Sequence, residues 1–154
     1  MSMSKIVRTT AQVITPAIVL YGMYLIVHGH ATSGGGFQGG AVFASSAVLL
    51  VVAFGVSRVA PHLKENPLMV LCSCGALLFI SLAFAGMGAT FFHNLFVGSS
   101  IFGNVPEFGS TPVDLWTGGT VPLMNFAVAM NVVGGLAAIV LAMALFSSSK
   151  GGDE

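Results

Sequence analysis

Long apolar stretches alternate along the chain with short segments that hold its charged residues. A bilayer core about 30 Å thick is crossed by a helix of about 20 apolar residues, so the pattern predicts four transmembrane helices. The predicted helices cover residues of about 9–28, 38–57, 67–92 and 122–146. Pro67 and Pro122 fall in the first turn of their helices, where no amide hydrogen is needed. Spanning helices also tolerate an internal proline such as Pro16.

The composition agrees with a lipid environment. Of the 154 residues, 55% are hydrophobic and 6% are charged, whereas about a quarter of an ordinary soluble domain is charged. We therefore expect an all-α integral membrane protein with a single domain over residues 1–154. The first apolar stretch is too long for a cleavable signal peptide and has no small-residue cleavage pattern. Zero net charge and the lack of a basic cluster argue against a nucleic-acid partner.

The basic residues predict the orientation. All of them lie before the first span, between the second and third, or after the fourth: Lys5, Arg8, Arg58, Lys64 and Lys150. Because Lys and Arg concentrate on the cytoplasmic side of membrane proteins, we expect both termini inside the cell. A glycine-rich turn between the first two helices and a long loop between the last two then lie outside.

No Asp, Glu, Lys or Arg lies within any of the four predicted spans. Ion paths and proton relays through a membrane are normally marked by such residues. The chain alone is therefore not expected to pump ions, which argues against a stand-alone four-helix transporter.

Residues 34–40 form the densest local motif of the chain. The motif consists of Gly34, Gly35, Gly36, Phe37, Gln38, Gly39 and Gly40. A phosphate-binding loop would end in Lys-Ser or Lys-Thr, which this motif lacks. Two interpretations stay open: a tight turn whose glycines pack against neighbouring helices, or a break that lines a water-filled ion path. The four-residue spacing of Gly40 and Ala44 favours packing.

Three histidines lie near the predicted outer surface: His28, His30 and His93. They have no carboxylate or cysteine beside them, so we expect neither a metal site nor catalytic residues. His30 could still contribute to a proton path, since histidine titrates near neutral pH. Cys72 and Cys74 point to different faces of a helix, and we expect them to be buried small apolar residues rather than ligands of a bound cofactor.

The last span carries small and amide side chains that suit contacts between helices. Asn125 and Asn131 can form hydrogen bonds across helices, and Gly134 and Ala138 begin a stripe of small residues that continues to Ala142. Such residues predict a close neighbouring helix.

The segment from His28 to Gly40, placed between the first two of four helices, resembles the MnhB (MrpB) subunit of multisubunit Na+/H+ antiporters. The family carries Gly-His, a short spacer and Gly-Gly-Gly-Phe-x-Gly-Gly at this point, and this chain departs from it in having Ser33 where proline is common. Residues 121–128 look closer to the MnhB-like subunits of membrane-bound hydrogenases and related energy-converting redox complexes.

The resemblance implies an accessory subunit in the cell membrane of a prokaryote. It implies Na+ and H+ as the transported ions, and as partners a large antiporter-like subunit, small C-, F- and G-type subunits and lipid. In such assemblies the large subunits hold the Lys and Glu residues of the proton path. A stand-alone transporter and a purely structural membrane adaptor remain as alternatives.

Overall fold

The computed structural model describes residues 3–31, 34–88, 90–105 and 115–150, and these form five helices. The helices are α1 (Lys5–His28), α2 (Gly36–Phe54), α3 (Val56–Val59), α4 (Glu65–Ala85) and α5 (Val121–Lys150). All except the four-residue α3 are long and apolar enough to cross a membrane. The predicted all-α fold with four spans is therefore confirmed. Thr32 and Ser33 lie outside the described residues.

The helix boundaries differ from the predicted ones, most of all at the end of α4. The prediction extends this helix to Phe92, but it ends at Ala85. The chain turns back here: the N–H of Phe92 donates to the carbonyl of Ala83, and His93 packs so closely on Gly86 that a methyl group there would stand 2.8 Å from the His93 backbone.

At the other end of the molecule, Gly55 ends α2 three residues earlier than predicted. Gly55 has a φ of +84°, which glycine adopts readily, and the chain continues into the short α3. The helices α1 and α5 are both longer than predicted. Ser4 caps α1, since its hydroxyl accepts a hydrogen bond from the amide of Val7 at 3.4 Å.

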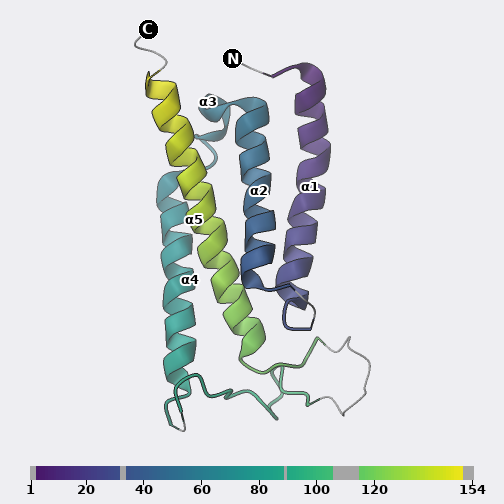
Figure 1. The fold of residues 1–154 in the computed structure, drawn as a ribbon, viewed down its shortest axis with the longest axis vertical. Helices are drawn as coiled ribbons and strands as arrows, with labels where there is room; N and C mark the ends of the chain where they lie inside the picture. The colour runs from purple at the N-terminus through teal and green to yellow at the C-terminus, as the bar shows by residue number, and fades with distance from the viewer. Residues whose placement is uncertain (1–2, 32–33, 89, 106–114, 151–154) are drawn as a thin grey trace.

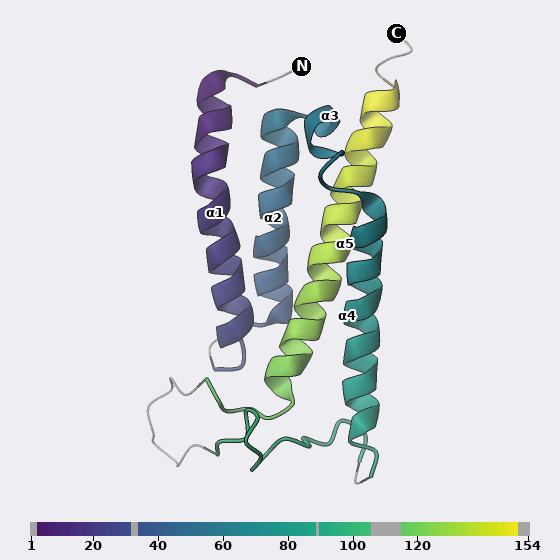
Figure 2. The ribbon, with the colours of Figure 1, turned by 180° about the vertical axis from the view of Figure 1, so that it is seen from behind.

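The four long helices lie side by side in the order α1, α2, α5, α4 (Figures 1 and 2). α1 packs on α2, α2 on α5, and α5 on α4, while the described parts of α4 touch neither α1 nor α2. The architecture is thus one open layer of helices rather than a closed bundle. The start of α1 and the end of α5 lie at one end, and the end of α1 and the start of α5 lie at the other (Figure 1).

Small residues fill the contacts between the helices. Most of the buried apolar residues are alanines: Ala11, Ala44, Ala53, Ala83, Ala127, Ala129, Ala137 and Ala138. Large apolar side chains such as Leu20 and Phe146 are instead exposed. This distribution suits a protein in lipid, where helices associate by close backbone packing rather than by hiding large apolar groups from water.

Candidate functional site

The glycine motif forms the start of α2 and joins three helices. Gly35 is the N-cap and Gly36 the first helical residue. A methyl group at Gly36 would collide with the backbone carbonyl of Asn125 on α5. One turn later, a methyl group at Gly40 would stand 3.0 Å from Val132 Cβ. Gly36 and Gly40 thus let α5 approach the backbone of α2.

Gly39 lies on another face of α2 and contacts α1. A methyl group there would stand 2.6 Å from Ile26 Cγ1 and 3.0 Å from the carbonyl oxygen of Gly22. A methyl group at Gly22 would in turn stand 2.9 Å from the amide nitrogen of Phe43. The two backbones therefore cross in near contact, and neither glycine has room for a side chain.

The other residues of the motif are less confined. Among the described residues, a methyl group at Gly34 would meet only the Leu25 side chain, at 3.6 Å, and Gly35 is extended, with φ of −146°. Phe37 is 60% exposed, and Gln38 is also exposed, although its Oε1 would stand 3.1 Å from a methyl group at Gly35. The geometry therefore supports packing for Gly36, Gly39 and Gly40 and leaves Phe37 available to lipid or to another subunit.

His30 lies beside the glycine motif, close to Gly118 just before α5. Its Cδ2 atom would stand 3.3 Å from a methyl group at Gly118. Both ring nitrogens of His30 are buried, and neither has a hydrogen-bond partner among the described residues. A buried polar atom without a partner is rare in native proteins and calls for an explanation such as a bound water or a functional role.

His28 and His93 lie apart from His30. His28 stacks on Tyr24, with 4.7 Å between ring centroids, and His93 packs on Gly86. Within the described ranges, no three His, Cys, Asp or Glu side chains come together in a way that could hold a metal ion.

Asn94 fixes the entry of the long connection into α5. Its Oδ1 accepts hydrogen bonds from the backbone N–H of Thr120 at 2.7 Å and from the Thr120 hydroxyl at 3.1 Å, and its Nδ2 donates to the Gly118 carbonyl at 3.0 Å. Thr120 is only 2% exposed. Gly119 has a φ of +61°, and a side chain there would collide with Asn94. Sequence reasoning missed Asn94, because a single amide in a long loop carries no periodic signal.

Asn131 and Gly134 lie on the side of α5 that faces α4. Asn131 Nδ2 donates to the carbonyl of Cys72 at 3.0 Å. A methyl group at Gly134 would stand 2.5 Å from the Leu68 carbonyl oxygen, and one at Gly75 would stand 2.6 Å from the backbone nitrogen of Asn131. Sequence reasoning also missed the contact at Gly75, although a glycine within an apolar span is a usable signal.

Of the other residues that the sequence predicts to pack between helices, some are buried and some are exposed. Ala138 is 8% exposed and Ala142 is exposed. Asn125 contacts Gly36 through its backbone rather than through its side-chain amide.

The expectation that both cysteines are buried is wrong, because Cys72 is half-buried and Cys74 is exposed on α4. Exposure of a thiol carries little penalty where the surroundings are lipid.

Known proteins resemble the chain over most of its length. A family model described as a domain related to the MnhB subunit of Na+/H+ antiporter matches residues 6–138. An uncharacterised protein of Methanocaldococcus jannaschii is 33% identical over 136 residues, which are 85% of this chain and 48% of that protein. The chain thus spans about half the length of this relative. The B-type subunit of the Na(+)/H(+) antiporter of Bacillus subtilis is 31% identical over 131 residues, 84% of this chain and 85% of that protein.

A Staphylococcus saprophyticus protein named antiporter subunit mnhB2 is 28% identical over 139 residues, 90% of this chain and 92% of that protein. The family-model match includes the glycine motif, His30, Asn94 and Asn131. These names describe antiporter subunits rather than enzymes. Together with the four apolar helices, they identify a multi-pass membrane protein. The resemblance predicted from the glycine motif is confirmed, and the chain belongs to the MnhB family of Na+/H+ antiporter subunits.

Proposed function

We propose that the chain is a non-catalytic accessory subunit of a multisubunit Na+/H+ antiporter module in the cell membrane of a prokaryote, with both termini inside. The observation that supports this most is an open layer of four apolar helices whose central turns carry no Asp, Glu, Lys or Arg. Such a layer offers two broad surfaces to neighbours but no ionisable group that could carry an ion across the lipid.

The partners we propose are a large antiporter-like subunit and the small C-, F- and G-type subunits. We further propose that this module is attached to a redox complex of the membrane-bound hydrogenase type. This last point is supported by the resemblance of residues 121–128, which begin α5 and include Asn125.

His30 supports a second, narrower proposal. Its ring nitrogens are buried without a described partner at the outer end of the layer, where a water molecule or a passing proton could use them. In this proposal His30 contributes to the ion path of the assembled complex, while Gly36, Gly39 and Gly40 pack the helices.

Two measurements test the main proposal. Native mass spectrometry of the detergent-purified complex should find the chain bound to other antiporter subunits, together with redox subunits if the attachment exists. Liposomes that contain the purified chain alone should show no Na+-dependent proton movement. Exchange by the chain alone would favour a stand-alone transporter, and a chain that purifies without partners would contradict the subunit role.

A further inference from the structure

Two hollows lie between α4 and α5 on the same face of the layer. The outer one has a volume of about 330 Å³ and the inner one about 470 Å³. Their linings on α5 follow each other at steps of three or four residues: Val128, Asn131, Gly135, Ile139 and Ala142. Positions at this spacing lie on one side of a helix. The two hollows therefore form one groove along the helix pair.

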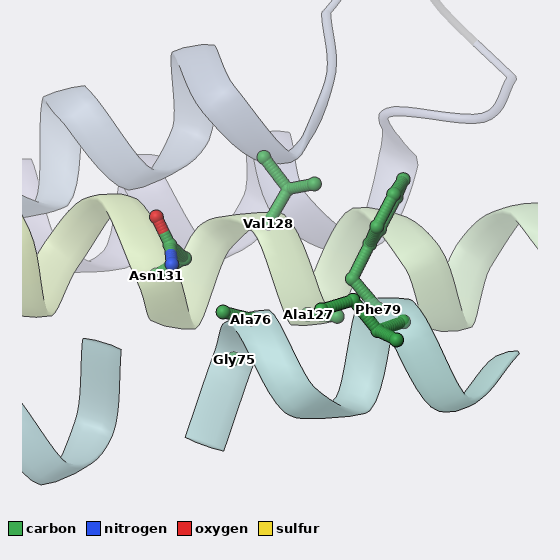
Figure 3. A pocket seen from close by; sticks show the side chains of 7 residues that line it. Gly75, Ala76, Phe79, Ala127, Val128 and Asn131 are labelled. Carbon is green, nitrogen blue, oxygen red and sulfur yellow. The ribbon is translucent and has the colours of Figure 1, made fainter. Parts of the chain in front are cut away.

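The lining of α4 has the same spacing. It includes Glu65, Met69, Cys72, Ala76 and Ile80. The groove thus runs from the first turn of α4, at the end of the layer where α1 begins, to beyond the middle of α4. Figure 3 shows its outer part, with Phe79 rising from α4 at one end and Asn131 at the other.

The side-chain amide of Asn131 uses only part of its hydrogen-bonding capacity in the contact between α4 and α5. Its Nδ2 donates to Cys72, but no described residue donates to its Oδ1. In Figure 3 this oxygen points away from α4. An amide oxygen within a membrane span is costly to leave unpaired, and the acyl chain of a lipid has no hydrogen-bond donor.

The floor of the groove also differs from the exposed surface of α1. Ala76, Gly135 and Ala142 provide little side-chain bulk, whereas exposed positions of α1 such as Val13 and Leu20 carry large apolar side chains. Small residues at a helix surface allow the backbone of another helix to come close. The floor and the open oxygen therefore both suit a helix that carries a donor.

We propose that the α4–α5 groove is the docking site for one transmembrane helix of another subunit, which lays a face of small residues into the groove and donates a hydroxyl or amide hydrogen to Asn131 Oδ1. This inference rests on the proposed role as a subunit.

Glu65 adds a second feature of the partner. It is exposed at the inner end of the groove, and no described basic side chain forms an ion pair with it. Glu65 lies seven residues from Cys72, which is about 10 Å along a helix. The cytoplasmic ends of spanning helices are rich in Lys and Arg. In this proposal the partner helix therefore carries a basic residue opposite Glu65, about two helical turns closer to the cytoplasm than the group that donates to Asn131.

Photo-crosslinking in the intact complex tests the site. The photoreactive residue p-benzoylphenylalanine is placed at Ile80 or Met69, large residues on the edge of the groove that are 50% and 56% exposed. Leu20 on α1, 68% exposed, is the control for a surface that faces lipid. Ile80 and Met69 should both crosslink to one and the same subunit, and Leu20 to lipid. Crosslinks from both groove positions to lipid alone would overturn the proposal.

A groove-filling substitution gives an independent measurement. Ala76→Phe should lower the amount of the crosslinked subunit that copurifies with this chain by at least about tenfold, which corresponds to 1.4 kcal/mol. Ala17→Phe, the same change on an exposed position of α1, should leave it unchanged. Full partner content in Ala76→Phe, at normal membrane levels of the chain, would overturn the proposal. If native mass spectrometry finds the chain without any partner, the proposed function fails; a complete complex with only lipid at the groove refutes only the docking site.

Discussion

Gly134 and Gly135 are neighbours on α5 that differ sharply in the space around them. A methyl group at Gly134 would stand 2.5 Å from the Leu68 carbonyl oxygen and 2.7 Å from the Cys72 amide nitrogen. At Gly135 the nearest atom would be Cys72 Sγ, at 3.6 Å, which is an ordinary contact distance. Alanine at the two positions therefore gives a matched pair of variants.

The expected difference follows from this geometry. An ordinary contact begins at 3.4 Å, so Gly134→Ala requires α4 and α5 to separate locally by about 0.9 Å. A gap of that size forfeits about a quarter to a half of each dispersion contact, and overpacking of this kind costs about 1–3 kcal/mol. The gain of about 1 kcal/mol in helix propensity from Gly to Ala applies to both variants. We expect Gly134→Ala to be less stable than Gly135→Ala by about 1–3 kcal/mol.

Unfolding by SDS in mixed micelles measures this difference. The purified chain is titrated with SDS, and the loss of helix contacts is followed for the wild type, Gly134→Ala and Gly135→Ala. The free energy of unfolding of Gly135→Ala should equal or exceed that of the wild type. If the two variants differ by less than about 0.5 kcal/mol, α4 and α5 do not meet through Gly134 and the close approach described above is wrong.

Three further predictions concern the ends of the layer. With both termini inside, a single cysteine that replaces Ser100, in a background without the native cysteines, should react with an impermeant thiol reagent from outside the cell. One that replaces Ser148 should react only after permeabilisation. The reverse labelling would show that the topology is inverted. Asn94→Ala leaves the buried amide of Thr120 without its acceptor, so it should lower the free energy of unfolding by about 1–3 kcal/mol in the same SDS titration, and wild-type stability would show that the loop does not depend on this bond. His30→Gln keeps a hydrogen-bonding side chain but has no imidazole nitrogen that could take up a proton. Na+-driven proton transport by the fully assembled complex should fall, and unchanged transport would assign His30 a structural role only.

The sequence predicts the four spans because an uncharged stretch of about 20 residues has few alternatives to a membrane helix. It does not predict where α4 ends. Residues 86–92 carry no charge, so hydropathy alone continues the helix. Gly86 is the C-cap of α4, and His93 packs closely on it where the chain turns. That contact joins residues across a turn and leaves no periodic trace in the sequence.

The packing of the glycine motif is also predicted only in part by the sequence. Its density predicts close packing, but the assignment of Gly36 and Gly40 to α5 and of Gly39 to α1 depends on the order of helices in the layer. Hydrophobic periodicity could not supply that order, because the spans are apolar on all sides and lipid does not select a buried face. The sequence indicates that Asn131 is an interhelical residue, yet its partner on α4 follows only from the structure.

The order of the helices also bears on how the chain is made. α4 is synthesised before α5, but within the described structure α5 is the long helix that α4 touches. During translation α4 must therefore wait in the bilayer without a neighbour while the following 35 residues, 86–120, and then α5 emerge. It is suited to that interval, since it has the highest mean hydropathy of the four spans. Of the four spans, the one synthesised last is thus the one that inserts between α2 and α4, and without α5 the α4 helix would be a solitary hydrophobic span in the bilayer.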